Sequence, residues 1–278
     1  MTFSIAARDG DAWGVAVASK FLAVGSVVPR VVPGTAAVAS QAMARVAYLD
    51  ELERALSDGH PVAAALADAV AADPGGDHRQ VGVVGRDGAA SYTGPSCLHW
   101  AGGRSGSDDT GSWAIQGNIL TGPEVVEAME DAWRAAAGQR LDDRLLAVLL
   151  AGDEAGGDAR GRQSAALLVR CPGAGYDGGG VLADLRVDDH PDAPREIARL
   201  HRLSTLFFGT AEDVEPLTGP LREEVRGLLT QQGHAPGGED DVETALEAWM
   251  GEENLENRHS PNGIDARVLE VLRAAPAG

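Results

Sequence analysis

Thr2 is the residue of this sequence best suited to act as a nucleophile. It begins a stretch in which apolar and polar residues alternate as far as an Asp9-Gly10 turn signal, and a second, largely apolar run follows at Trp13–Ala18. This pattern predicts a β-hairpin with Thr2 at the free end of its first strand. Once Met1 is removed, Thr2 carries a hydroxyl group and an α-amine with a pKa of about 7.7 to 8.0, so the nucleophile has its own base.

The hairpin also returns Ser19 and Lys20 to the neighbourhood of Thr2. An ammonium group there would stabilise an alkoxide and lower the pKa of the α-amine. A simpler interpretation stays open, because small residues often follow an initiating methionine and strands often begin chains. The nucleophile hypothesis therefore depends on whether the rest of the sequence supplies the other parts of such a site.

A source of oxyanion donors is predicted next along the chain. Val27–Pro33 is extended and punctuated by proline, and Ala36–Ala39 forms the following strand. Ser40 and Gln41 then open a helix whose apolar residues recur at helical spacing as far as Leu56, with Ser40 as its N-cap. A helix that begins directly after a strand presents free backbone N–H groups, which an oxyanion site requires.

Gln116 and Asn118 carry side chains suited to orienting a substrate. They are predicted at the end of a strand, after an exposed and flexible loop at Gly102–Gly111. Their amides at this place either hold a substrate carbonyl or amine, or support a turn by bonding to their own backbone. The sequence leaves both interpretations open.

The glycine-rich segment Gly156–Ser164 is a second candidate for binding. It carries Asp158, Arg160 and Arg162 directly before an apolar strand. Such a loop binds carboxylate or phosphate groups through arginine side chains and backbone N–H groups, or it is a solvated linker. It lacks a Gly-Lys-Ser/Thr ending, so a nucleotide P-loop is not supported.

Asp188, Asp189 and His190 stand next to one another in the sequence and could ligate a metal ion. The alternative is that they cap the helix predicted at Ala193–Leu206, whose positive end favours acidic residues. The choice between the two stays open, and no metal is predicted as part of the site.

Composition restricts the classes of partner. The chain has 278 residues, a net charge of −19 and a sequence pI near 4.6, which argue against binding to nucleic acids or to anionic membranes. No apolar run approaches the ~20 residues that span a bilayer, and no leader precedes Thr2, so a cytoplasmic location is expected. Cys97 and Cys171 are interpreted as core thiols in a reducing compartment.

Helices in pairs alternate with groups of antiparallel strands as far as about Leu206. This order predicts two sheets with helices on their outer faces, which is an α+β fold. The same region resembles the domain of unknown function 1028 family (DUF1028), which is similar to a branch of the N-terminal-nucleophile (Ntn) hydrolase superfamily. The resemblance is carried by Thr2–Ile5, Gly14–Phe21, Ala39–Ala42, Arg79–Val84, Gln116–Leu120, Gly157–Ser164 and Asp184–Pro191.

The resemblance implies a four-layer αββα sandwich that hydrolyses amide bonds with an N-terminal residue. Thr2 falls at the position of the nucleophile, Ser40 and Gln41 fall where oxyanion donors are found, and Lys20 falls where an assisting group is found. Members of the family often have an Asn-Pro pair and an aromatic stretch after the position of Gln41. Here Met43–Val46 occupies that place, so different substrate contacts are expected there.

The region after residue 208 is strongly acidic but contains three amphipathic patterns. They predict three short helices that form a small all-α domain, with Trp249 in its core. The segment Glu243–Leu272 resembles a peptidoglycan-binding domain. Packing or oligomer contacts are an equally supported role for it. The predicted domains are therefore residues 1–208 and 209–278.

The sequence thus predicts an amidohydrolase without cofactor or metal that cleaves a small amide or peptide. The candidate catalytic residues are Thr2, Lys20, Ser40 and Gln41, and the candidate substrate-binding residues are Ser19, Gln116, Asn118, Asp158, Arg160 and Arg162. The alternative is a non-catalytic protein that binds a small metabolite or a cell-wall fragment on the same fold. Assembly into a homo-oligomer is left open.

Overall fold

The computed structural model describes residues 2–238 and 241–276. Contacts between residues divide the chain into two compact units, Met1–His201 and Arg202–Gly278. The division lies within helix α5 (Ala193–Phe208), a few residues before the boundary expected from the sequence. Within the described ranges, every helix is too short or too polar to cross a lipid bilayer.

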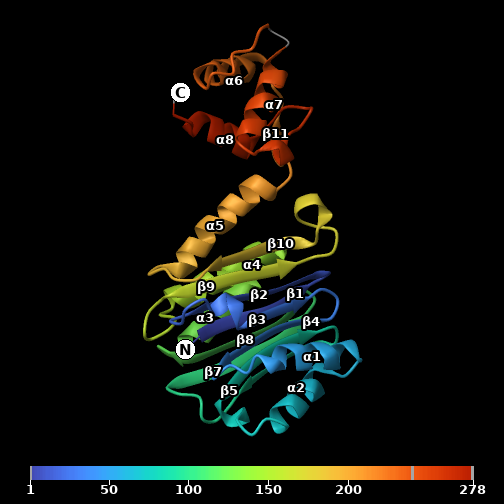
Figure 1. The fold of residues 1–278 in the computed structure, drawn as a ribbon, viewed down its shortest axis with the longest axis vertical. Helices are drawn as coiled ribbons and strands as arrows, with labels where there is room; N and C mark the ends of the chain where they lie inside the picture. Colours follow the sequence, from blue (N-terminus) through green and yellow to red (C-terminus); the bar gives the residue numbers. More distant parts are fainter. Residues whose placement is uncertain (1, 239–240, 277–278) are drawn as a thin grey trace. The chain divides into compact units, whose positions relative to one another are not determined.

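The first unit contains a six-stranded sheet in the order β10-β9-β2-β1-β8-β7, and each pair of neighbours is antiparallel (Figure 1). Its strands are β1 (Thr2–Asp9), β2 (Ala12–Ser19), β7 (Trp100–Asp108), β8 (Gly111–Leu120), β9 (Ser164–Arg170) and β10 (Val181–Val187). The predicted hairpin is confirmed, since Phe3 pairs with Ala18 and Asp9 with Ala12. Thr2 therefore begins a central strand, between β2 and β8.

Successive side chains of β1 point alternately to the two faces of this sheet. Phe3, Ile5 and Ala7 are buried in a core shared with α3 (Glu124–Ala135), α4 (Leu141–Glu154) and the start of α5. Ala6 faces the other way, into a core shared with the second sheet. Because successive residues of a strand point to opposite faces, Thr2 and Ser4 lie on the same face as Ala6.

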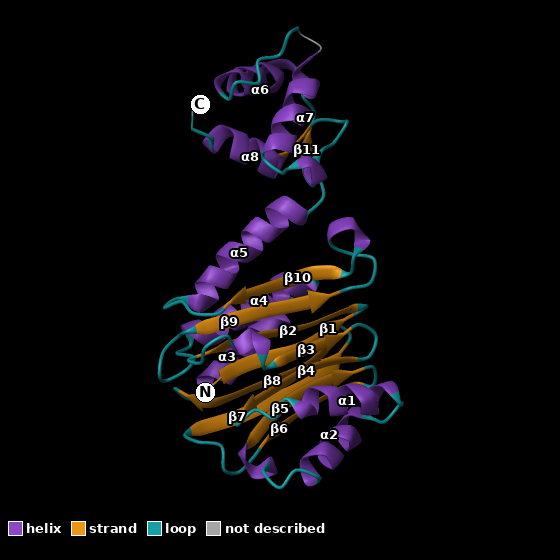
Figure 2. Cartoon of the chain, in the orientation of Figure 1, coloured by secondary structure: helices purple, strands orange, loops and turns teal. Residues whose placement is uncertain are grey.

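The second sheet has four strands in the order β3-β4-β5-β6. They are β3 (Pro29–Val32), β4 (Ala36–Ala42), β5 (Arg79–Gly85) and β6 (Gly88–Thr93). Ala37, Ala39 and Val84 face the first sheet. The opposite face of the second sheet packs on α1 (Ala47–Ser57) and α2 (Val62–Ala71), which Figure 2 shows beside it. The first unit is therefore a mixed α/β structure with two antiparallel sheets.

The prediction that Ser40 and Gln41 open a helix is wrong. Strand β4 continues to Ala42, and α1 begins only at Ala47 with Val46 at its N-cap. Gln41 pairs with Gln80 across β4 and β5, and the backbone N–H of Ser40 donates to the carbonyl of Val28. Pairing with β5, which is distant in sequence, extends the strand through residues that resemble a helix cap.

The prediction of a flexible loop at Gly102–Gly111 is also wrong. These glycine- and serine-rich residues form most of β7, an edge strand that pairs with β8 from Trp100 to Asp108. Strand β8 itself runs on to Leu120. Gln116 and Asn118 consequently lie within a strand, where they are buried, and not in a turn after it.

In the second unit the three helices predicted after residue 208 are confirmed. They are α6 (Gly219–Gln231), α7 (Val242–Glu252) and α8 (Ala266–Ala274). Trp249 is buried at their centre, as expected. The unit is not entirely helical, because β11 (Val214–Glu215) pairs with β12 (Ile264–Asp265) in a short antiparallel ladder.

Candidate functional site

Thr2 and Ser19 lie side by side where the first hairpin ends. The hydroxyl oxygens Thr2 Oγ1 and Ser19 Oγ are 3.1 Å apart, at hydrogen-bond distance, and both residues are buried. The β1–β2 register, in which Phe3 pairs with Ala18, places the two residues opposite each other. The structure thus confirms that Ser19 returns to the neighbourhood of Thr2. Removal of Met1 concerns a residue outside those that the structure describes.

Amide side chains from both sheets hold the carbonyl oxygen of Thr2. Gln41 Nε2, from β4, donates to it at 3.2 Å, and Asn118 Nδ2, from β8, donates at 3.5 Å. Both amides also donate to Gln80 Oε1, at 2.8 and 2.9 Å respectively. Gln80 therefore fixes the two donors relative to each other, and together they fix the start of β1.

A second layer of this network extends between the sheets at Ser4. Its hydroxyl donates to Gln41 Oε1 at 2.6 Å and accepts from Gln116 Nε2 at 2.6 Å. Gly82 makes room for Gln116, because a Cβ atom at position 82 would overlap the Gln116 amide. The network therefore occupies space that a side chain on β5 would otherwise fill.

Sequence reasoning missed Ser4 and Gln80 as members of this network. Gln80 is wholly buried and its Nε2 donates to the carbonyl of Gly117 at 2.7 Å. A signal was present in the sequence, since Gln80 directly precedes the apolar run at residues 81–84 of β5. An amide in such a strand needs buried partners, and those partners come from other strands.

Ser40 does not join this group. Its Oγ donates to the carbonyl of Arg45 at 3.0 Å, and its neighbour Val38 lies in the core between β4 and α1. Alternation therefore places Ser40 and Gln41 on opposite faces of β4. The expected helix N-terminus at this point is not formed, so Gln41 reaches the site through its side-chain amide.

Lys20 and Asp158 connect the site to the loop after α4. Asp158 Oδ2 accepts from the backbone N–H of Lys20 at 2.8 Å, and Asp158 forms a backbone bridge with Leu120 at the end of β8. Lys20 Nζ donates to the carbonyl of Arg162 at 3.3 Å. The loop thus joins the end of β8 to the end of β2. Since β1 lies between those strands, the loop passes the end at which Thr2 begins.

The two arginines predicted in this loop have carboxylate partners. The backbone N–H of Arg160 donates to Asp158 Oδ1 at 2.9 Å, and its guanidinium lies 3.4 Å from Asp158 Oδ2. Arg162 Nε donates to Asp153 Oδ1 at 2.6 Å, and this bond raises the pKa of Arg162 above its usual value. These contacts between arginines and acids therefore stabilise the conformation of the loop.

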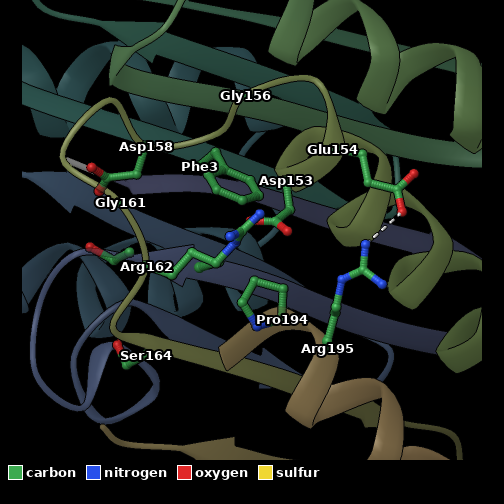
Figure 3. Close-up of a pocket in the computed structure, with 12 residues that line it drawn as sticks. Phe3, Asp153, Glu154, Gly156, Asp158, Gly161, Arg162, Ser164, Pro194 and Arg195 are labelled. Carbon is green, nitrogen blue, oxygen red and sulfur yellow. Dashed lines mark hydrogen bonds and ion pairs between the residues drawn. The ribbon is translucent and has the colours of Figure 1, made fainter. Parts of the chain in front are cut away.

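A pocket of about 400 Å³ lies beside this loop, between the end of α4 and the start of α5 (Figure 3). Its wall includes Phe3, Ser19, Asp153, Arg162 and Arg195. Because Phe3 and Thr2 point to opposite faces of β1, this part of the wall lies across the sheet from the Thr2 side chain. Ser19, whose Oγ lies 3.1 Å from Thr2 Oγ1, belongs to the same wall, so the pocket also reaches the residue beside Thr2.

Metal ligation at Asp188, Asp189 and His190 is not what the structure shows. Asp188 pairs with Arg186, and His190 Nδ1 accepts from the backbone N–H of Asp192 shortly before α5. Neither contact reaches a backbone N–H of α5, so the capping alternative stays a prediction. In the described part of the chain, the one group of potential ligands that converges consists of Asp142, Asp143 and His201, whose ligand atoms lie within 4.8 Å of one another.

The Asp142 carboxylate is engaged by two side chains of the protein, His201 and Arg140. His201 Nε2 lies 2.8 Å from Asp142 Oδ2, and Arg140 donates to both oxygens of Asp142. Burial raises the pKa of Asp142, but the hydrogen bonds and charges of His201 and Arg140 outweigh burial and hold that pKa well below its usual value. An arginine on the carboxylate disfavours a metal ion there, so this cluster is a link between α4 and α5.

The fold and the buried site define a mixed α/β protein with two antiparallel sheets joined by an amide network at the start of β1. Residues 2–197 match the model of the "Family of unknown function (DUF1028)", and the chain belongs to this family. Residues 208–272 match the model of the "Putative peptidoglycan binding domain".

The solved structures similar to this chain include protein SPO2555 from Silicibacter pomeroyi, itself described by the DUF1028 family model. The two share 29% sequence identity with a TM-score of 0.64, over 80% of this chain and 92% of that one. No curated protein is significantly similar to the chain.

Proposed function

We propose that this protein is an amide hydrolase of the Ntn type that acts on a small amide or peptide, with Thr2 as its nucleophile after removal of Met1. The observation that carries the proposal is the position of Thr2. Its hydroxyl lies 3.1 Å from that of Ser19, and its carbonyl accepts two side-chain amides at the start of a central strand. A nucleophile needs such fixed geometry, because misplacement slows attack steeply.

The architecture supports the proposal at the level of the fold. Three cores follow one another, with α3 and α4 packed on the first sheet, the two sheets packed on each other, and α1 and α2 packed on the second sheet. We interpret this succession as the four-layer αββα sandwich that the family resemblance implies. A fold supports many chemistries, so the activity itself depends on the site.

The proposed reaction begins with attack of Thr2 Oγ1 on the substrate carbonyl carbon, while the Thr2 α-amine accepts the hydroxyl proton. The tetrahedral intermediate collapses, the C–N bond breaks, and the protonated α-amine donates its proton to the leaving amine. Water then attacks the Thr2 ester with the α-amine again as base, releasing a carboxylic acid and restoring the hydroxyl. Ser19 Oγ orients Thr2 Oγ1 for both steps.

We assign the stabilisation of the oxyanion to Asn118. Its 3.5 Å bond to the carbonyl of Thr2 is long for a hydrogen bond, so exchange of that bond for one to a substrate oxygen loses little. Gln41 and Gln80 act as positioning residues for Asn118. Lys20 donates to the carbonyl of Arg162, so Ser19 is favoured over Lys20 as the direct partner of Thr2.

The proposal is tested by intact mass spectrometry of protein expressed with its natural start and no N-terminal tag. We expect a species without Met1 that gains the mass of one β-lactone at Thr2 and hydrolyses members of an amide library. Thr2→Ala abolishes labelling and hydrolysis, whereas the control Thr244→Ala, at an exposed threonine on α7, changes neither. Quantitative retention of Met1 contradicts the mechanism, because an acylated amine is no base.

A non-catalytic role is the second candidate, favoured by the match of residues 208–272 to a peptidoglycan-binding model. It predicts binding of a small metabolite or cell-wall fragment without turnover. Intact, unlabelled protein that binds such a fragment would support this role over hydrolysis. Cys97 and Cys171 are free thiols of intermediate burial rather than the core thiols expected from the sequence, and neither candidate function uses them.

A further inference from the structure

Asp153, in the last turn of α4, has one carboxylate oxygen without a partner. The residue is 5% exposed and lines the pocket shown in Figure 3. Its Oδ1 accepts from Arg162 Nε at 2.6 Å, but its buried Oδ2 has no hydrogen-bond partner among the described residues. Buried carboxylate oxygens are normally satisfied, so this oxygen calls for a donor from outside the chain.

Because Asp153 lies at the C-terminal end of α4, its carboxylate is further stabilised by a positively charged partner. A carboxylate near a helix C-terminus meets the negative end of the helix dipole, which disfavours it. Glu154 follows it directly in the same turn of α4. Arg162 provides one cation, and a second positively charged donor at Asp153 Oδ2 would complete the environment of the carboxylate.

A metal ion is not the donor that this pocket fits. Within the described residues, the ligand atoms of Asp153, Glu154 and Asp158 do not form a converging group of three. Asp158 already accepts from the backbone of Lys20 and of Arg160. A single open carboxylate oxygen instead suits an N–H donor, and an ammonium group supplies both the proton and the charge.

Arg195, at the start of α5, is the second charged element of the pocket. Its side chain is 63% exposed, and its guanidinium lies 3.7 Å from Glu154 (Figure 3). Asp192 lies 3.9 Å from the same guanidinium, and both separations are beyond hydrogen-bond distance. At these separations the guanidinium of Arg195 can donate to a closer carboxylate instead. A carboxylate in the same pocket would form the two-pronged contact that arginine favours.

We propose that this pocket binds a small zwitterion, a free α-amino acid or a dipeptide, with its ammonium group on Asp153 Oδ2 and its carboxylate on Arg195. A volume of about 400 Å³ accommodates a molecule of this size. The pocket wall at Phe3 lies on the face of β1 opposite the Thr2 side chain, but the wall also includes Ser19, whose Oγ lies 3.1 Å from Thr2 Oγ1. The zwitterion site is therefore next to the proposed nucleophile, and its occupation can be measured without any reaction at Thr2.

Calorimetric titration of the full-length Thr2→Ala protein tests the proposal without any turnover. The probes are L-alanyl-L-alanine, its C-terminal amide, and its N-acetyl derivative. We expect the free dipeptide to bind, the amide to bind about 10-fold more weakly, and the N-acetyl derivative to show no heat of binding. Equal binding of all three probes, or binding of none, overturns the proposal.

Substitutions of the pocket residues test whether the dipeptide binds in this pocket. Asp153→Asn is expected to weaken dipeptide binding by 10-fold or more, and Arg195→Gln to remove the preference for the dipeptide over its amide. Asp68→Asn, at an exposed acid on α2, is the matched control and leaves both unchanged. Arg195 is exposed, so its substitution tests the site even where Asp153→Asn impairs folding. Unchanged affinity in Arg195→Gln places the dipeptide elsewhere and overturns the proposal, independently of labelling at Thr2.

Discussion

Gln41 and Thr2, 39 residues apart in sequence, meet where the two sheets face each other: Gln41 Nε2 donates to the carbonyl oxygen of Thr2 at 3.2 Å. The same nitrogen donates to Gln80 Oε1, and Gln41 Oε1 accepts from Ser4. Gln41 Nε2 also donates to the carbonyl of Gln116 on β8 at 3.3 Å, so one amide joins four strands. The start of β1 is therefore fixed by buried side-chain amides on one face, in addition to the apolar packing of Phe3 on the other.

We therefore expect Gln41→Leu to destabilise the protein. The leucine removes the partner of the Ser4 hydroxyl and one donor to Gln80, and each orphaned buried group costs about 1–3 kcal/mol. Equilibrium denaturation with urea should show a lower midpoint. Gln139→Leu, at an exposed glutamine, is the control and should change the free energy of unfolding by less than about 0.5 kcal/mol. Equal stability of both variants would show that the network adds nothing.

Gly82→Ala tests the space beside Gln116. A methyl group at this position overlaps the Gln116 amide, which cannot move away without breaking its bond to Ser4. Overpacking of this kind costs about 1–3 kcal/mol. The matched control is Gly227→Ala in α6, where a Cβ meets nothing within 4 Å. That change should stabilise the helix by up to about 1 kcal/mol, so the two alanines should shift the melting temperature in opposite directions.

The order of strands and helices was predictable because alternation and helical periodicity are local signals. The hairpin of β1 and β2, the helices α2 to α5, and the three helices of the second unit all follow from such patterns. Ser40 misled because its local chemistry favours a helix cap, while pairing of β4 with β5 decided the outcome. The glycine- and serine-rich part of β7 was missed because these residues have low strand propensity, yet β8 provides a partner for them.

The candidate site was predictable only in part. The hairpin register brings Ser19 to Thr2, so that contact could be inferred from one segment. The amides of Gln41, Gln80 and Asn118 come from three further strands in two sheets, and no local pattern states which strands pair or which sheets face each other. Asp153 was missed because the apolar helical pattern of the sequence runs from Leu141 to Leu150 and stops before the last turn of α4, which carries Asp153.

Ser19→Ala tests whether the Ser19 hydroxyl assists Thr2. The substitution removes one hydroxyl group and fits the same space, so folding should be retained. Loss of a group that orients the nucleophile and its proton transfer should slow β-lactone labelling of Thr2 by on the order of 100-fold. The rate is followed by intact mass over time. Ser26→Ala, at an exposed serine, is the control for general effects on reactivity. Unchanged labelling in Ser19→Ala would assign Ser19 a structural role.

Asp142 makes the free energy of unfolding of the first unit depend on pH. Its pKa in the folded state lies below the unfolded value of about 3.9, because the hydrogen bonds and charges of His201 and Arg140 outweigh the effect of burial. A depressed carboxyl pKa contributes stability that is fully present above the unfolded pKa and is lost as the pH falls towards the folded pKa. The contribution of Asp142 should therefore be intact at pH 7 and decline below about pH 4.

Asp142→Asn removes that contribution. Since hydrogen bonds to charged groups contribute about 1.5–3 kcal/mol, we expect a loss of this size at pH 7, measured by urea denaturation. Below pH 4 the difference from the wild type should shrink, because the wild-type carboxylate is itself being protonated there. Asp143→Asn is the control, since that side chain is 48% exposed and its replacement should have little effect at either pH. A difference that stays constant from pH 7 to pH 2.5 would mean that packing, and not the charge of Asp142, links α4 to α5.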